Sequence, residues 1–257
     1  MSDAGDGGDE VIHDAPNFIR VYKSGRVERF LRIDFAPPST DAATGVTSKD
    51  VVAGDGVSGR LYLPATPCGG HWVASHADGQ GEEPWLTAHA DFGRVHVGGE
   101  SAGANIAHHA AMRAGAEELG HGVKVNSLVL IHPYFLGGDS SESDEMGMAL
   151  LRELIRLWPV VCPGTSGCDD PWINPMADGA PSLSVLGCRR ALVCIGGKDA
   201  MRGRGKLYCE KLRESGWQGE VEIWEADGQG HGFHLLWPTC TQAEAQVQTI
   251  AEFLSHG

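Results

Sequence analysis

The segment Gly99-Glu100-Ser101-Ala102-Gly103 places a serine between two glycines, where a strand-like run (94–98) gives way to a helix-like run (104–114). Glycines on both sides permit a strained turn that lifts the serine hydroxyl above a sheet, where it can act as a nucleophile. An ordinary glycine turn whose serine caps a helix has the same local pattern. The motif therefore indicates nucleophilic chemistry only if partner residues exist.

A nucleophilic serine needs a base that removes its proton. His231 lies in the glycine-rich loop 228–234, after the last strand-like run, and such a loop can bring an imidazole to Ser101. His234, three residues further on, is the competing base. We expect the histidines around the serine motif to be packed or solvated: His96, His108 and His109.

The base in turn needs a carboxylate that orients it. Asp199 follows the buried-type strand 191–195, just past its carboxyl end, where catalytic groups gather in open α/β sheets. A helix N-cap is the alternative role for this aspartate. The rival carboxylate, Asp227, precedes His231 by only four residues, so we prefer Asp199.

The elements that must position these residues alternate along the chain. Strand-like runs at 94–98, 125–134, 191–195 and 221–224 alternate with helical stretches at 104–114, 146–158, 204–215 and 241–255. This order predicts an α/β fold with a mostly parallel sheet flanked by helices. Earlier in the chain, 47–63 reads as an antiparallel hairpin around Gly54 and Gly56. Residues 1–10 are acidic and glycine-rich, which predicts a disordered N-terminus followed by a single domain over 11–257.

Composition excludes several classes of function. The 257 residues carry a formal net charge of −14 without a basic cluster, which argues against binding to nucleic acid or to a membrane surface. The seven cysteines form no C-x-x-C pair, so neither a disulfide framework nor a zinc site is expected, and no metal or cofactor is implied. We expect a cytoplasmic protein, with a nuclear location also open, and the oligomeric state is not predicted.

Several longer motifs resemble the plant carboxylesterases of the hormone-sensitive-lipase group, which have the α/β-hydrolase fold. The resemblance covers nearly all of 11–256 and is carried by 18–30, 99–109, 169–175, 198–204, 211–217 and 230–234. It implies that Ser101 is the nucleophile, Asp199 the orienting acid and His231 the base of an esterase for small esters. It also implies a helical cap formed by about 11–35 and 139–160. The pocket beneath that cap would have Leu151 and Trp158 as candidate lining residues.

The chain departs from this family at one place. Members carry a His-Gly-Gly-Gly stretch whose N–H groups bind the oxyanion together with the N–H after the nucleophile, here Ala102, and this stretch is absent. The chain passes almost directly from 61–64 to a predicted helix at 71–77 that in the family follows two further strands and a crossover helix. We therefore expect two central strands to be missing, a segment of about 50 residues or more. The segment Cys68-Gly69-Gly70 could offer substitute donors or serve as a plain linker.

Three hypotheses for function follow from the resemblance and the departure. The first is a serine carboxylesterase that is slowed by the loss of its oxyanion loop. The second is a non-catalytic binding protein like the gibberellin receptors, which share the fold but lack the catalytic histidine. His231 favours the enzyme over the receptor. The third is an inactive truncated variant.

Overall fold

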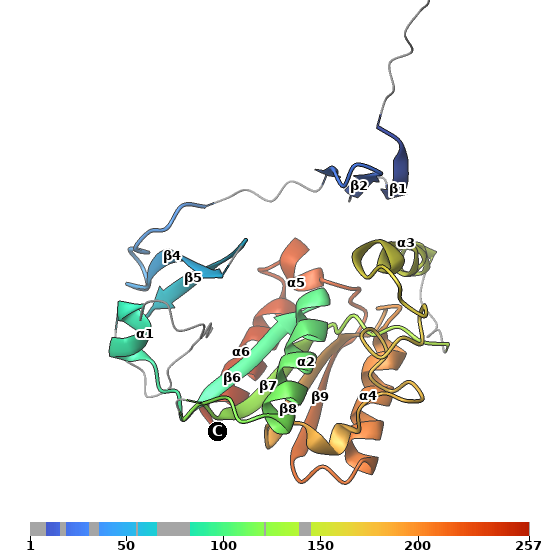
Figure 1. The fold of residues 1–257 in the computed structure, drawn as a ribbon. Coiled ribbons are helices and arrows are strands. Elements are labelled where there is room, and N and C mark those ends of the chain that lie inside the picture. The colour runs from blue at the N-terminus through green and yellow to red at the C-terminus, as the bar shows by residue number, and fades with distance from the viewer. Residues whose placement is uncertain are drawn as a thin grey trace, which may run out of the picture.

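The computed structural model describes residues 9–15, 19–30, 36–54, 56–65, 83–120, 122–138 and 145–256. Its centre is a four-stranded parallel sheet in the order β6-β7-β8-β9 (Figure 1). These strands are β6 (Val95–Glu100), β7 (Val125–Ile131), β8 (Arg190–Gly196) and β9 (Glu220–Ala226). The predicted parallel sheet and the α/β fold are confirmed.

Helices cover both faces of this sheet. On one face, α2 (Ala102–Ala116) packs on β6 and β7, and α4 (Arg202–Glu214) packs on β8 and β9. On the other, α6 (Thr241–Ser255) packs on β8 and β9. The two central strands, β7 and β8, are buried on both faces, which explains why their sequences are continuously apolar, whereas the edge strand β9 alternates apolar residues with glutamates.

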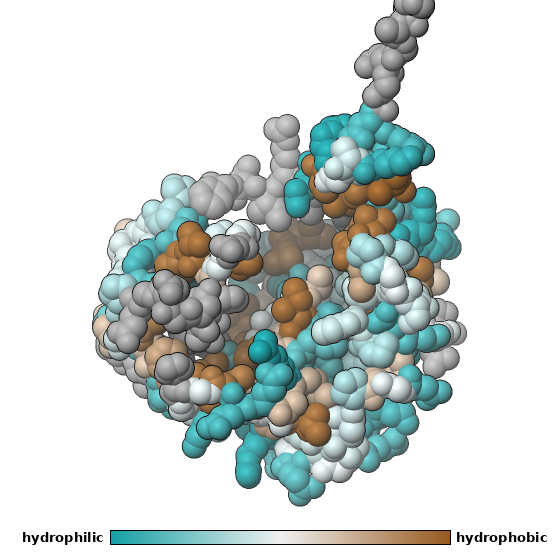
Figure 2. Space-filling model, in the orientation of Figure 1, coloured by the Kyte–Doolittle hydropathy of each residue, from teal (hydrophilic) through white to brown (hydrophobic). Residues whose placement is uncertain are grey.

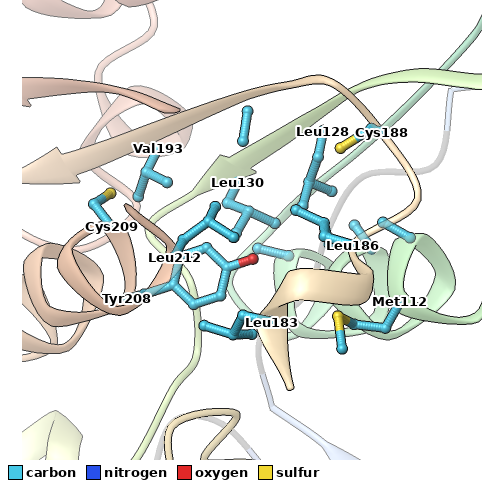
Figure 3. Close-up of a cluster of buried hydrophobic side chains, with 14 of the residues drawn as sticks. Met112, Leu128, Leu130, Leu183, Leu186, Cys188, Val193, Tyr208, Cys209 and Leu212 are labelled. Atoms are coloured by element: carbon cyan, nitrogen blue, oxygen red, sulfur yellow. The ribbon is translucent and has the colours of Figure 1, made fainter. Parts of the chain in front are cut away.

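The main core lies between the sheet and the helices α2 and α4. Leu128, Leu130 and Val193 point into it from the strands, where they meet Tyr208 and Leu212 of α4 (Figure 3). The short 3₁₀ helix η1 (Leu183–Val185) closes the same cluster. The intervening strand residues face the opposite side and pack under α6: Val129, Leu192 and Cys194. Burial on both sides gives the strand ends the rigid frame that a catalytic site needs.

The segment expected to form the first part of a helical cap is not helical where the structure describes it. It forms a small antiparallel sheet of β1 (Val11–Ala15), β2 (Ile19–Tyr22) and β3 (Val27–Arg29). Short strands that pair only with their neighbours in sequence satisfy their backbone locally and give no helical period to detect. The second cap segment does contain a helix, α3 (Glu145–Val161), and β1 contacts it.

The predicted hairpin forms as β4 (Thr47–Gly54) and β5 (Val57–Leu63), a separate two-stranded sheet. A short helix, α1 (Pro84–His89), leads from this region to β6. The predicted helix at 71–77 and the segment 68–70 lie outside the described residues.

Strand β6 occupies one edge of the parallel sheet. It pairs with β7, and no strand in the described part of the chain pairs with its other side. This is the arrangement expected if the two family strands that would lie between the hairpin and β6 are missing. The edge leaves backbone N–H and C=O groups without ladder partners among the described strands.

Candidate active site

Ser101 stands on the sharp turn between β6 and α2. Its backbone has φ 52° and ψ −114°, a left-handed conformation that is unfavourable for a residue with a side chain. Its N–H donates to the Ile131 carbonyl over 2.9 Å, and its carbonyl accepts the Tyr134 N–H over 3.1 Å. These two bonds hold the strained turn against the loop that follows β7, so the hydroxyl is presented in a fixed position.

His231 joins the serine to an aspartate. Its Nε2 lies 2.9 Å from Ser101 Oγ, and its Nδ1 lies 2.7 Å from Asp199 Oδ2. Asp199 is 2% exposed, and its Oδ1 accepts the Met201 N–H over 2.9 Å. With Nδ1–H donating to Asp199, Nε2 is left as the acceptor for the serine proton.

The parallel sheet brings these three side chains together because each follows the carboxyl end of a strand. Ser101 follows β6, Asp199 follows β8 and His231 follows β9. The loops of β8 and β9 are also tied directly, since the Lys198 N–H donates to the Gln229 carbonyl over 2.8 Å. All three predicted residues therefore lie at the carboxyl-terminal end of the sheet, as expected from parallel topology.

The two alternative residues, Asp227 and His234, lie elsewhere. Asp227 is exposed on the loop after β9. His234 lies in α5 (Phe233–Leu236), where its ring contacts His132 at a centroid distance of 5.2 Å. The structure thus places His231, and not His234, between Ser101 and Asp199.

The other histidines near the serine motif make structural contacts. Nδ1 of His96 lies 2.7 Å from the Ser127 hydroxyl, and Nδ1 of His108 lies 3.0 Å from the Tyr208 hydroxyl. His109 contacts the Trp172 carbonyl and ring. These contacts agree with the expectation that the three histidines are packed or solvated, since His108 is buried and the other two are half-buried.

The electrostatics of the site raise the pKa of His231 and lower the pKa of Asp199. Burial alone would lower the pKa of His231, but the hydrogen bond and the charge of Asp199, with a contribution from Glu100, raise it above its ordinary value. Burial likewise opposes the charge of Asp199, yet the bond to His231 holds the pKa of this carboxyl below its usual range. Each partner stabilises the charged form of the other.

Glu100 is a site residue that the sequence reasoning did not single out. Its Oε1 lies 3.9 Å from His231 Nε2, on the serine side of the imidazole. Burial, opposed by His231 and supported by the charge of Asp199, raises the pKa of Glu100. Its position beside Ser101 in the motif could have suggested the proximity, but the motif does not specify the direction of this side chain.

His132 is the second residue that was missed. It follows β7 just as Asp199 follows β8, is fully buried, and has an unusual positive φ of 44°. Its Nδ1 accepts the N–H of Gly232 over 2.9 Å. The strand-end rule that pointed to Asp199 could have pointed to His132 as well.

A metal would have to compete with these hydrogen bonds. In the described part of the chain, His132, Asp199 and His231 offer ligand atoms that all lie within 4.8 Å of one another. The Asp199 and His231 atoms are already joined through a proton. A metal could therefore enter only by displacing the proton between Asp199 and His231.

A small, mostly apolar cavity of about 190 Å³ lies between the loop after β7, α3 and the start of α4. It is lined by 135–138, by Leu151 and Ile155 of α3, and by Ala200, Met201 and Arg204, and none of Ser101, Asp199 and His231 is among its lining residues. Leu151, which the resemblance made a candidate lining residue of the substrate pocket, thus lines this cavity. Trp158 is buried in a neighbouring apolar cluster with Tyr134 and Ile173.

Among the described residues, Ala102 is the position that corresponds to the oxyanion donor implied by the family resemblance. Ala102 begins α2, and an N–H in the first turn of a helix has no intrahelical acceptor. This N–H is therefore available to a substrate oxygen next to Ser101.

No helix in the described ranges combines the length and apolar character required to cross a bilayer.

Comparison with known proteins agrees with this geometry. A family model described as alpha/beta hydrolase fold matches residues 70–235. The chain is 33% identical to a 2-hydroxyisoflavanone dehydratase of Glycyrrhiza echinata, with 95% of this chain and 96% of the relative covered. It is 32% identical to probable carboxylesterase 1 of Arabidopsis thaliana, with 95% and 98% covered.

Solved structures extend the similarity to bacteria and archaea. A hyperthermophilic esterase from Pyrobaculum calidifontis superposes with a TM-score of 0.50 at 25% identity, over 67% of this chain and 57% of that one. The esterase LipW from Mycobacterium marinum gives 0.52 at 20% identity, over 67% and 54%, and this likeness shows the fold alone. The chain thus spans little more than half the length of the solved esterases it matches.

The alignment with the Glycyrrhiza echinata protein runs over 316 residues, which exceeds the 257 residues of this chain. That relative therefore contains residues that have no counterpart here. The family match, the two plant relatives and the fold lead to one assignment. This chain belongs to the α/β-hydrolase fold family, in the hormone-sensitive-lipase-like group of plant carboxylesterases.

Proposed function

We propose that this protein is a serine carboxylic ester hydrolase in which Ser101, His231 and Asp199 act as a catalytic triad on small esters. The observation that carries the proposal is the continuous chain of hydrogen bonds from Ser101 Oγ through the His231 ring to Asp199, at 2.9 and 2.7 Å. The names of several plant relatives, such as probable carboxylesterase 1, support the same reaction class.

The first half of the reaction forms an acyl-enzyme. Ser101 Oγ attacks the ester carbonyl carbon while its proton passes to His231 Nε2, and the carbonyl oxygen becomes an oxyanion. The Ala102 N–H faces that oxygen as a donor. His231 then returns the proton to the departing alkoxide, the carbon–oxygen bond breaks, and the alcohol leaves.

The second half releases the acid. Water loses a proton to His231 Nε2 and attacks the acyl carbon, and the tetrahedral intermediate collapses as the proton returns to Ser101 Oγ. Asp199 remains ionised throughout. It holds the Nδ1–H tautomer and stabilises the imidazolium that forms in each half.

The substrate is a small neutral ester. We take the cavity lined by Ala200 and Met201, which directly follow Asp199, as the site for one part of the ester; it is mostly apolar and about 190 Å³ in volume, which suits a short acyl or alcohol group better than a long chain. The absent His-Gly-Gly-Gly stretch makes this a slow enzyme, because each lost oxyanion donor costs about 10²–10³ in rate. Short p-nitrophenyl esters should therefore turn over faster than long ones, and all of them slowly.

The test is reaction of the purified chain with a fluorophosphonate probe, followed by peptide mapping. We expect label at Ser101 and none in Ser101→Ala, because only a serine beside a functioning base attacks such probes readily. Ser184→Ala, which alters an exposed serine far along the sequence, is the matched control and should label normally. A folded sample that takes up no label would instead support a binding protein that kept the pocket without the chemistry.

A second pair of variants tests the assignment of the base. His231→Ala should abolish labelling, whereas His234→Ala should retain most of it, because only His231 lies within hydrogen-bond distance of Ser101 Oγ. The reverse result would move the base to His234 while leaving a serine hydrolase in place.

A further inference from the structure

We propose that His132 is a positioning residue of the triad: by accepting the Gly232 N–H, it fixes the loop that aims His231 at Ser101. This inference rests on the proposed function for its consequence in rate, but its structural content can be measured without any turnover. It assigns a role to a buried histidine that takes no part in the proton transfers described above.

The contact acts on the backbone directly next to the base. His132 Nδ1 accepts the N–H of Gly232 over 2.9 Å, and Gly232 is covalently bonded to His231. Gly232 has φ 65° and begins the short helix α5, so the chain turns sharply at this point. A hydrogen bond on this peptide group restricts the backbone torsion through which His231 could swing away from Ser101.

His132 is itself held from several sides. Its own N–H donates to the Cys194 carbonyl of β8 over 2.8 Å. Two residues close to His132 in sequence hydrogen-bond the backbone of Ser101. The Ile131 carbonyl accepts the Ser101 N–H, and the Tyr134 N–H donates to the Ser101 carbonyl. One four-residue segment, 131–134, therefore fixes the backbones of both Ser101 and the His231 loop.

The imidazole has the chemical form that this role requires. Burial above all, with the nearby His231, lowers the pKa of His132 to about 3, so the ring stays neutral at the pH of ester hydrolysis. Because Nδ1 accepts a hydrogen bond, the ring proton must be on Nε2. A neutral acceptor adds no positive charge beside the imidazolium that forms on His231.

The surroundings indicate a fixed ring rather than interchangeable packing. The His132 ring contacts the rings of His231 and Phe233 at centroid distances of 5.5 Å, and that of His234 at 5.2 Å. Its positive φ of 44° is one of only two at non-glycine residues in the described part of the chain, the other being Ser101. Strained backbone of this kind persists where surrounding contacts over-determine it.

The first experiment uses the unmodified chain labelled with ¹⁵N. A through-hydrogen-bond ¹⁵N–¹⁵N coupling between the Gly232 amide and His132 Nδ1 should be observed. The titration of the His231 ring should give a pKa above its ordinary value, since the charges of Asp199 and Glu100 face it. The two neighbouring rings, His132 and His234, have pKa values lowered by burial. The absence of the coupling in a folded sample would overturn the inference, whether or not Ser101 reacts with any probe.

The second experiment compares two substitutions at His132. Asn keeps an acceptor at the Nδ1 position and tolerates a positive φ, whereas Leu fills similar space without an acceptor. His132→Leu should slow fluorophosphonate labelling of Ser101 by about 10–100-fold and lower the pKa of His231, because misplacement weakens its bond to Asp199. His132→Asn should restore both values to within about threefold and a few tenths of a pH unit of wild type.

His108→Leu is the matched control for loss of a buried histidine. His108 is 2% exposed and its pKa is also about 3 because of burial, but it bonds Tyr208 away from the triad. The His108→Leu substitution should lower the melting temperature without changing the pKa of His231. If His132→Asn titrates no differently from His132→Leu, the acceptor is irrelevant and the inference is wrong. If wild-type Ser101 takes up no label while the coupling is present, the proposed function fails and the positioning role stands.

Discussion

Gly99 and Gly103 approach so closely across the serine turn that a Cβ added to Gly99 would lie 2.1 Å from the Gly103 carbonyl oxygen. That distance is shorter than any real carbon–oxygen contact, and the clashing atom is backbone, which cannot move aside. Gly99→Ala should therefore destabilise the fold by about 1–3 kcal/mol or more and displace Ser101. Thermal unfolding and the rate of Ser101 labelling measure the two effects.

Gly103 provides the control within the same motif. A Cβ there would meet nothing within 4 Å, and Gly103 lies inside α2. Gly103→Ala should be neutral or stabilise the protein by up to about 1 kcal/mol, as alanine does in helices. Equal damage from both substitutions would mean that the motif needs its glycines for a reason other than this contact.

The second prediction concerns the carboxylate that orients the base. Asp199→Asn should lower the rate of Ser101 labelling by several orders of magnitude, on the order of 10⁴, because the amide no longer selects the Nδ1–H tautomer. Asp227→Asn changes an exposed aspartate on the neighbouring loop and should leave the rate nearly unchanged. A large loss in the Asp227 variant together with a small loss in the Asp199 variant would reverse our assignment.

The strand ends and the positions of Ser101, Asp199 and His231 could be predicted because they follow simple rules. The central strands β7 and β8 are continuous apolar runs, and the three residues come after the strands β6, β8 and β9 in turn. Parallel pairing places the carboxyl ends of the strands at the same end of the sheet. This placement follows from the topology alone, so it can be predicted before any side-chain contact is known.

The remaining features depend on tertiary contacts that no local pattern contains. The short strands β1–β3 pair with one another, and their mixed apolar and charged residues give no clear period. His132 stands in no motif, and its hydrogen bond joins it to Gly232, 100 residues away in sequence. Glu100 is within the motif, but only the turn of the backbone directs it toward His231.

The third prediction uses Glu100 to test the electrostatics of the base. Labelling of Ser101 requires neutral His231, so its rate should rise with pH through the pKa of His231, which lies above the ordinary value. Glu100→Gln removes a negative charge 3.9 Å from Nε2, so the pKa should fall and the acidic limb should move to lower pH. The shift should be about half a pH unit, since partly exposed ion pairs contribute about 0.2–1 kcal/mol and one pKa unit is 1.36 kcal/mol.

The direction of this shift is the decisive feature. If the acidic limb of the pH–rate profile of Glu100→Gln moved to higher pH, Glu100 would not act through its charge on His231. Glu117→Gln provides the control, because Glu117 lies at the far end of α2 in an exposed pair with Arg113. That substitution should leave the pH profile where it is.

The last prediction concerns the open edge of β6. In a complete family member this strand would be paired on both sides, and here its outer backbone groups have no strand partner in the described part of the chain. Close to the site, α5 and the residue after it expose Leu235, Leu236 and Trp237 at 65, 65 and 58%, and apolar residues surround a hollow on this face (Figure 2). We expect the chain to self-associate as its concentration rises, against the repulsion of its net charge of −14, and to melt below Arabidopsis thaliana probable carboxylesterase 1.

Insertion of a family member's His-Gly-Gly-Gly strand-helix-strand segment after Gly70 should restore monomeric behaviour, raise the melting temperature and increase ester turnover by at least about 10² through the regained oxyanion donors. Sedimentation over a range of concentrations, thermal unfolding and p-nitrophenyl acetate hydrolysis measure the three changes. A strictly monomeric, equally stable and equally active chain without the insertion would mean that residues already present cover the edge and supply the donors.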